Sequence, residues 1–395
     1  MRRFITPRLA LLAVGHFSID AYSSFFSPLL PLLVARLHLS LTSVGVLVAL
    51  VSLSSSLSQP LFGMLSDRLA RPWFVAFGPL VAAVFMSAIG LAPHFGSLVA
   101  LLMIGGLGAA AFHPQAAVLA SDTLPRRSVA MSLFVTGGTV GFSLGPLYAV
   151  TVVGLVGIER TWLAAAPGLL VAGLMLAWFS RAQPRRHHAA ARPRLAELRP
   201  MLRPLTLLYF AVVCRSAVSY GFMTFLALYL HARGVPVAAG GALLTAYLLS
   251  GALGGFFGGW LAERWGGKRV VVASFIGAIP LFNAFLLLQP FAGIVALVLG
   301  SFALQASLPV NVVMGQELSP RHSSTISSLL MGAAWGLGAL LVGPIGALAD
   351  AHGLPFALFV LALLLVGGLG CALALPDVRR HVPVAEMAQP ATVVD

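Results

Sequence analysis

Two long stretches of this chain contain no charged residue. Residues 72–121 and 270–316 lack Asp, Glu, Lys and Arg, and each is about twice as long as the roughly 20 apolar residues that cross a bilayer once. Pro93-His94 and Gln289-Pro290 interrupt these stretches near their middle. Each stretch therefore predicts two membrane-spanning helices joined by a short turn.

The same apolar pattern continues along the rest of the chain and predicts an all-α integral membrane protein with twelve spans. We expect helices at residues 8–34, 41–65, 73–92, 97–120, 128–153, 161–180, 204–231, 237–262, 269–289, 291–316, 323–349 and 354–375. The chain contains 41 glycines, which fits helices that pack closely within lipid.

Composition excludes the main soluble classes of protein. Apolar residues make up 59% of the chain and charged residues only 9%, whereas soluble domains carry about a quarter charged residues. A soluble enzyme, a nucleic-acid-binding domain and a disordered chain are therefore excluded. Cys214 and Cys371 lie in apolar runs, which argues against a disulfide scaffold. The first apolar stretch is too long for a removable signal peptide.

The basic residues predict the topology. Of the 24 Lys and Arg residues, only Arg36, Arg160 and Arg233 fall in the odd-numbered gaps between spans, and twenty fall in the even-numbered gaps and the two tails. This bias predicts that both termini and the central loop are cytoplasmic in a bacterial-type inner membrane. The positive charge then serves topology and contact with lipid headgroups, so nucleic acid is not needed to explain it.

The longest predicted loop divides the chain into two similar halves. We expect an N-terminal six-helix bundle at 1–180, a cytoplasmic basic linker at 181–203, a C-terminal six-helix bundle at 204–376 and a cytoplasmic tail at 377–395. Gly, Leu, acid and Arg recur in register in the loops that begin at Gly63 and Gly259. Two pseudo-symmetric bundles are typical of transporters in which one half rocks against the other.

Three motifs carry a resemblance to a known family. The loops Gly63-Met-Leu-Ser-Asp67-Arg68-Leu-Ala-Arg71 and Gly259-Trp-Leu-Ala-Glu263-Arg264-Trp-Gly-Gly-Lys268-Arg resemble the hallmark loop of the major facilitator superfamily, and Gly141-Phe-Ser-Leu-Gly145-Pro146 resembles its antiporter motif. The resemblance implies the major facilitator fold and alternating access. It also implies a gating role for Gly63, Asp67, Arg68, Arg71, Gly259, Glu263, Arg264, Lys268, Gly141, Gly145 and Pro146.

A narrower resemblance points to efflux. Gly15-His16-Phe17 with Asp20, then Phe112-His113-Pro114, and finally Gly315-Gln316-Glu317-Leu318 together resemble the fosmidomycin-resistance family, although Gln115 stands where that family typically has glutamate. The resemblance implies proton-coupled antiport of a small organic compound or drug, such as a fosmidomycin-like phosphonate. The expected partners are that compound, protons and membrane lipids. We expect a monomer that needs no cofactor, because the proton gradient supplies the energy.

Polar residues inside the predicted spans are the candidate site residues, because a polar side chain in lipid must face protein or water. They concentrate in the first, fourth, seventh and tenth helices, which line the cavity in the superfamily that this chain resembles. The candidates for proton coupling are Asp20, His16 and Glu317, and those for substrate binding are Arg215, His113, Gln115, Gln305, Asn311 and Gln316.

Asp20 is the central candidate. His16 and Asp20 lie one helical turn apart on the same face, near the middle of a span. Because burial penalises a charged carboxylate, Asp20 is expected to exchange a proton. The alternative is a static ion pair between Asp20 and Arg215. Arg215 itself could hold a carboxylate or phosphonate in its planar fork, or could only balance the charge of Asp20.

Two further candidates also have simpler explanations. His113 could relay a proton or bind substrate, but it could also pack at a kink caused by Pro114. Glu317 could pair with Arg321 at the surface.

Rival functions also remain open. The chain could carry an ordinary metabolite such as an organic acid, in either direction. A membrane-embedded enzyme or receptor is the third possibility. The sequence contains no catalytic triad, paired catalytic carboxylates, metal cluster or nucleotide-binding loop, which argues against an enzyme.

The topology prediction can be checked with a reporter that is active only in the periplasm. Fused after Arg194, it should be silent, because the twenty basic residues on one side place residues 181–203 in the cytoplasm. Activity of that fusion would overturn the assignment of the spans.

Overall fold

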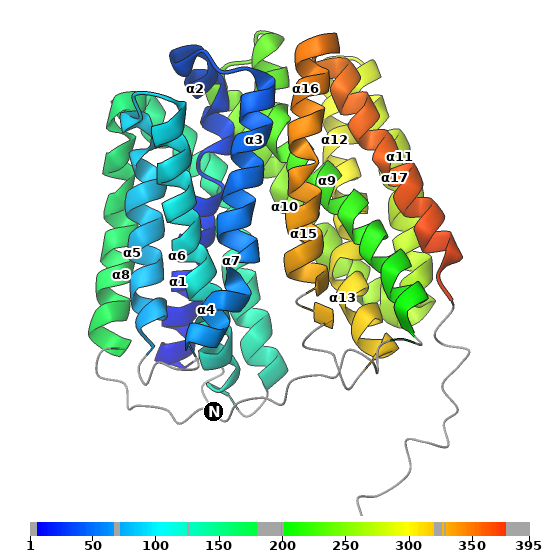
Figure 1. Ribbon diagram of the computed structural model, residues 1–395, viewed down its shortest axis with the longest axis horizontal. Coiled ribbons are helices and arrows are strands. Elements are labelled where there is room, and N and C mark those ends of the chain that lie inside the picture. The colour runs from blue at the N-terminus through cyan, green and yellow to red at the C-terminus, as the bar shows by residue number, and fades with distance from the viewer. Residues whose placement is uncertain are drawn as a thin grey trace, which may run out of the picture.

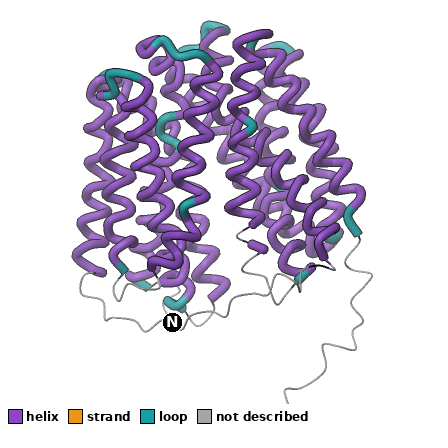
Figure 2. The backbone as a smooth tube through the Cα atoms, in the orientation of Figure 1, coloured by secondary structure: helices purple, strands orange, loops and turns teal. Residues whose placement is uncertain are grey.

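The computed structural model describes residues 6–66, 72–124, 127–179, 199, 201–319, 326–327 and 329–376. Within these ranges all regular structure is helical (Figure 2). Twelve segments are long and apolar enough to cross a membrane, which confirms the predicted fold class. They are Pro7–Leu37, Leu41–Ser66, Trp73–Leu91, Phe95–Ser121, Val129–Val156, Ile158–Phe179, Leu202–Ala232, Val237–Trp265, Gly267–Leu287, Pro290–Leu318, Leu329–His352 and Leu354–Ala374.

The helices of the first half precede the predicted linker. They are α1 (Pro7–Ser23), α2 (Leu30–Leu37), α3 (Leu41–Ser52), α4 (Gln59–Ser66), α5 (Trp73–Ser87), α6 (Phe95–Ser121), α7 (Arg127–Val156) and α8 (Ala165–Phe179). Four short segments of 3-10 or π helix join them, namely η1 (Ser27–Leu29), η2 (Leu53–Leu57), η3 (Ala88–Leu91) and η4 (Ile158–Ala164).

The helices of the second half follow the linker and end before the C-terminal tail. They are α9 (Leu202–Ala232), α10 (Val237–Trp265), α11 (Gly267–Leu287), α12 (Pro290–Gln305), α13 (Ser307–Leu318), the π-helical η7 (Leu329–Ala333), α15 (Ala334–Leu340), α16 (Val342–His352) and α17 (Leu354–Ala374).

The two predicted interruptions occur where the sequence places them. His94 caps α6 by accepting a hydrogen bond from the Ser97 amide, and Pro290 is the first residue of α12. Pro290 suits that position because the first turn of a helix leaves its N–H groups unpaired.

Several spans that we expected to be continuous are broken. The first, tenth and eleventh spans break before Ser27, at Ala306 and at Leu341. Each break lies a few residues before a proline, namely Pro28, Pro309 and Pro344. Because proline has no N–H to donate and its ring crowds the carbonyl four residues earlier, it disrupts the helix at these points.

The spans gather into two groups that lie side by side (Figure 1). In the first group α1 packs against α7, and α5 packs against α6 and α8. In the second group α9 packs against α15 and α17, and α11 packs against α12 and α17. The largest buried side chains, such as Phe112 and Phe222, fill the interior of these groups.

The two groups contact each other mainly through α3 with α16 and α7 with α10. The start of α3 and the end of α16 lie at the end of the molecule opposite the N-terminus (Figure 1). Gly45 allows close approach of α3 to the start of α16, since a Cβ on it would lie 2.5 Å from the Val342 carbonyl oxygen.

One acidic side chain ties the two groups together at that end. Asp350 of α16 accepts hydrogen bonds from the Leu41 amide (2.9 Å), the Thr42 amide (2.8 Å) and the Thr42 hydroxyl (2.6 Å). Its carboxylate therefore caps the N-terminus of α3, where the helix dipole favours negative charge. Sequence reasoning gave Asp350 no role.

Asp350→Ala should loosen the contact between α3 and α16, because two backbone N–H groups lose a charged acceptor. A loss of about 1 kcal/mol would shift the population of separated ends roughly fivefold. Spin labels at Ala35 and His352 would measure this as a longer distance distribution. Thr42→Val removes only the hydroxyl bond and should have a smaller effect. An unchanged distribution in Asp350→Ala would show that this contact does not hold the ends together.

Candidate functional site

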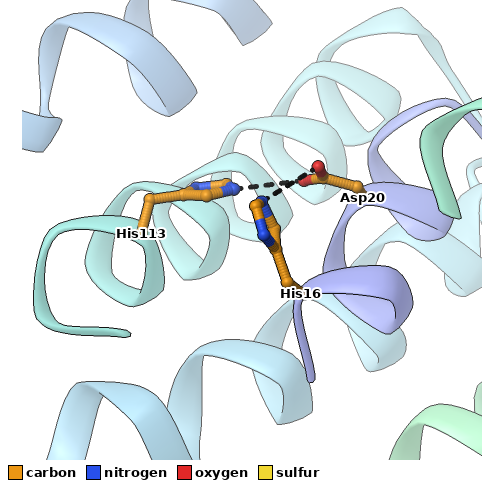
Figure 3. A group of neighbouring side chains, drawn as sticks. All are labelled: His16, Asp20 and His113. Carbon is orange, nitrogen blue, oxygen red and sulfur yellow. Dashed lines mark hydrogen bonds and ion pairs between the residues drawn. The ribbon is translucent and has the colours of Figure 1, made fainter. Parts of the chain in front are cut away.

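Three ionisable side chains meet inside the first group of helices (Figure 3). Asp20 and His16 belong to α1, and His113 belongs to α6. His16 Nε2 lies 3.2 Å from one carboxylate oxygen of Asp20, and His113 Nε2 lies 3.1 Å from the other. Each oxygen of the carboxylate therefore faces one imidazole, and we call these three residues the His-Asp-His cluster.

Both imidazoles are anchored through their second nitrogen. His16 Nδ1 lies 2.8 Å from the carbonyl oxygen of Phe134 in α7, and His113 Nδ1 lies 2.7 Å from the carbonyl oxygen of Ala109. A carbonyl oxygen can only accept a hydrogen bond, so each Nδ1 must carry a proton. The nitrogen that gains and loses a proton is therefore Nε2, which faces Asp20.

Counting hydrogens in the His-Asp-His cluster sets its proton content. If Asp20 were ionised and both imidazoles neutral, each Nε2 would turn a lone pair toward a carboxylate oxygen. At 3.1–3.2 Å such contacts are favourable only when a proton lies between the two atoms. Two bridging protons satisfy both contacts and give the cluster one net positive charge. The geometry is thus that of a site which can hold two exchangeable protons.

The contact between α1 and α7 has no room for larger side chains. A Cβ on Gly138 would lie 2.6 Å from Asp20 Oδ2 and closer still to the His16 ring, and a Cβ on Gly141 would overlap the Phe17 carbonyl. The Phe134 ring stacks on the His16 ring at 4.2 Å between centroids. Small residues on α7 therefore bring the Phe134 carbonyl within reach of His16.

The cluster could also hold a metal ion. Its three ligand atoms all lie within 4.8 Å of one another, and it is the one such group of His, Cys, Asp or Glu among the described residues. We did not expect a metal site from the sequence. The Nδ1–H groups of both histidines bond to carbonyls, and this is also the arrangement that orients metal-binding histidines.

Arg215 of α9 lies in the second group of helices, away from Asp20. Its guanidinium donates to Gln305 Oε1 (2.8 Å) and to the Ser216 hydroxyl (3.1 Å). No carboxylate of the described residues forms an ion pair with it. The alternative of a static Asp20–Arg215 pair is therefore wrong, because two histidines of the first group surround Asp20 instead.

The side chain of Gln115 joins two helices and forms no hydrogen bond with the His-Asp-His cluster. Its amide donates to the Ser66 hydroxyl (3.0 Å) at the end of α4, and its carbonyl accepts from the Val75 amide (3.1 Å) in the first turn of α5. Both ends of the side chain are therefore used in joining α4 to α5. Gln115 was a candidate for substrate binding because it is a polar residue within a predicted span, and in the structure its side chain forms this contact.

The remaining candidates of the tenth span are separate from one another. Asn311 is buried, and its side-chain amide makes no hydrogen bond among the described residues. Gln316 donates to the Ser327 hydroxyl at 2.8 Å. Glu317 is exposed, and Arg321, its suggested partner, lies outside the described residues.

The motif glycines pack alike in the two halves. A Cβ added to Gly63 would lie 3.7 Å from Pro114, and a Cβ added to Gly259 would lie 3.8 Å from Pro309. Gly266 adopts a left-handed conformation (φ +88°) between α10 and α11, which favours glycine.

Other gating candidates lie within one half of the molecule. Lys268 donates to the Leu375 carbonyl after α17, and Arg264 stacks on Trp260. Glu263 lies near the end of α10. Pro146 lies inside α7, and the preceding Gly145 packs on the Ala21 carbonyl. Asp67, Arg68 and Arg71 lie outside the described residues.

Sequence reasoning missed three contributors. Phe134 and Gly138 act through a backbone carbonyl and a missing side chain, which a search for polar residues cannot find. Trp335, which lies 5.5 Å from the Arg215 guanidinium, was detectable as an aromatic residue in a glycine-rich span.

Comparison with known proteins identifies the fold and its relatives. The family model of the Major Facilitator Superfamily matches residues 12–241 and 208–394. The MFS-type transporter YfnC of Bacillus subtilis is 29% identical over 95% of this chain and 94% of its own length. The Fosmidomycin resistance protein of Escherichia coli is 28% identical over 94% of this chain and 93% of its own length. These matches confirm the resemblance seen in the sequence motifs.

A solved structure agrees with the fold. The chain superposes on a bacterial homologue of the human lysosomal transporter Spinster, in an inward-facing and occupied conformation, with a TM-score of 0.81 and 19% identity. The match covers 96% of this chain and 98% of the other.

Gly138→Ala should damage the His-Asp-His cluster, because the new methyl group would overlap His16 and Asp20. Overpacking of this kind costs about 1–3 kcal/mol, and thermal unfolding of the purified protein would measure the loss. Gly154→Ala on the same helix is the matched control, since a Cβ there meets nothing within 4 Å. It should be neutral or slightly stabilising. Equal melting of the two variants would contradict the packing described for Gly138.

Proposed function

The chain belongs to the major facilitator superfamily, and we propose that it exports a small organic compound across a bacterial-type inner membrane in exchange for protons. Its relatives and its fold are those of transporters, not enzymes. The direction of transport, the coupling ion and the membrane are what this proposal adds to the family assignment. No cofactor enters the proposal, because the proton gradient supplies the energy.

The observation that carries proton coupling is the His-Asp-His cluster. An ionisable residue inside a membrane span is costly, so its retention indicates a functional role. Asp20 is surrounded by the two groups best suited to exchange protons near neutral pH, and both have their second nitrogen fixed by a carbonyl. The cluster can therefore gain or lose protons with little movement of its side chains.

The contacts between the halves support alternating access. With the arginine-rich end in the cytoplasm, as we propose, Asp350 and the α3–α16 contact close the opposite, outer end of the transporter. Protons that enter from outside would load the cluster in the outward-open state. Their release to the cytoplasm would change the net charge of the His-Asp-His cluster from +1 to −1, and the binding of substrate would then allow the halves to rock back.

The substrate is proposed from the relatives. One full-length relative is named for fosmidomycin resistance, so fosmidomycin and other small drugs are the first compounds to test. The alternative is an ordinary organic acid. Growth inhibition in a drug-sensitive host, with and without the protein, separates the two. Increased resistance supports export of a drug, whereas rescue of growth on an organic acid supports uptake.

Asp20→Asn should abolish transport driven by a pH gradient, because the amide keeps the shape of the carboxyl group but cannot titrate. The variant should still fold, with a change in stability of about 1 kcal/mol or less, since Asn can donate to one imidazole and accept from the other. Proteoliposomes with an imposed pH gradient would measure uptake of radiolabelled fosmidomycin into the lumen.

The matched control is Glu159→Gln, which removes an exposed carboxylate near Arg36 and should transport normally. His16→Ala should shift the pH optimum without eliminating transport, because His113 still faces Asp20. Normal transport against a gradient by Asp20→Asn would refute the proposed role of Asp20. A chelator should not change transport by the wild-type protein, and inhibition by it would indicate that the cluster works with a metal ion instead.

A further inference from the structure

Arg215 carries a buried positive charge for which the described residues provide no counter-ion. The side chain is only 2% exposed and lies near the middle of α9, roughly 20 Å from the nearer helix end. A guanidinium stays charged in proteins, and a charge in a low-dielectric interior is destabilising unless it is paired. The position of Arg215 therefore calls for an explanation.

Among the described residues, the neighbours of the guanidinium are polar or aromatic and carry no negative charge. Gln305 Oε1 accepts from Nη1 and the Ser216 hydroxyl accepts from Nη2, whereas Nε is buried and makes no hydrogen bond among the described residues. The guanidinium carbon lies 5.5 Å from the centre of the Trp335 ring. The site thus satisfies the hydrogen-bonding groups of Arg215 in part and leaves its charge unpaired.

The Arg215 site lies close to the interface between the two halves. Gly336, next to Trp335, packs against Leu57 of η2 in the first half. The Tyr220 hydroxyl, one and a half turns after Arg215, lies beside Ser52 and Ser56 of the first half. A compound bound at Arg215 would therefore sit where the halves meet, as substrates of two-bundle transporters do.

We propose that Arg215, Gln305 and Trp335 form an anion-binding site, and that the transported compound supplies the missing negative charge as a carboxylate or phosphonate. This inference rests on the proposed transport function and adds the residues that bind the anionic group of the substrate. The guanidinium fork can hold two oxygens of such a group at once. Trp335, whose ring centre lies 5.5 Å from the guanidinium carbon, favours a small organic anion over an inorganic ion.

Gln305 has a specific part in this site. Its amide oxygen occupies the position on Nη1 that an anionic oxygen would take, at 2.8 Å. A neutral acceptor there holds the guanidinium in place without cancelling its charge. An anion can then displace Gln305 or bind beside it, because a charged acceptor forms the stronger bond.

Gln305→Glu tests this site, because it places a permanent carboxylate where the substrate would bind. We expect the variant without ligand to melt at a higher temperature than the wild type, since Arg215 gains a partner. The two probes are fosmidomycin, a phosphonate, and benzoate, a carboxylate. At least one of them should raise the melting temperature of the wild type, and their neutral esters should leave it unchanged. Neither anion should raise the melting temperature of Gln305→Glu.

Two further variants serve as controls. Gln289→Glu adds the same charge in the turn before α12 and should respond to the anions as the wild type does. Arg215→Lys keeps the charge but loses the fork, so its response should need at least tenfold more ligand. The proposal is overturned if no anion stabilises the wild type, or if Gln305→Glu still responds.

These measurements use purified protein in detergent without a gradient, so they do not depend on proton coupling. Asp20→Asn should keep the full anion response. If the anions raise the melting temperature as predicted but a pH gradient does not drive transport, only the proposed proton coupling is refuted. If transport depends on the gradient but the wild type shows no anion response, the substrate class is wrong and the coupling stands.

Discussion

A carboxyl group within a membrane span must be either protonated or paired, and the surroundings of Asp20 meet this requirement. Each oxygen of Asp20 faces one imidazole at 3.1–3.2 Å, and each imidazole is fixed by a backbone carbonyl. The pairing partners are themselves titratable. The arrangement therefore stabilises the acid and keeps its protons exchangeable, which a fixed Asp–Arg pair could not do.

The tight packing of α1 against α7 makes this arrangement possible. Glycines at 138 and 141 leave room for the His16 ring and the Phe17 carbonyl, and Phe134 then reaches His16. His113 enters from α6, and the adjoining Pro114 and Gln115 contact the end of α4 and the start of α5. The short Phe-His-Pro-Gln segment thus links the cluster to α4, which carries Gly63 of the first copy of the repeated motif.

Much of the fold follows from the sequence, because lipid requires about 20 apolar residues per span. The breaks within spans do not follow from it, since Pro114 and Pro146 lie inside continuous helices. Asp20, His16, His113 and Arg215 are also identifiable, since ionisable residues are rare in spans. The sequence does not show which of these residues pair with one another, because pairing depends on how the helices pack. Asp20 meets two histidines instead of Arg215, and Gln115 serves a helix junction. Glycines and carbonyls that shape the site carry no chemical signature in a sequence.

The central claim is that the His-Asp-His cluster carries the protons that are exchanged for substrate. Counting the protons that cross the membrane for each substrate molecule tests it most directly. Proteoliposomes with a pH-sensitive dye in an acidic lumen would receive radiolabelled fosmidomycin from outside. The account predicts that the wild type moves up to about two protons out of the lumen for each molecule taken up, and that Asp20→Asn moves none. Substrate uptake without proton movement by the wild type, or equal proton movement by both proteins, would contradict it.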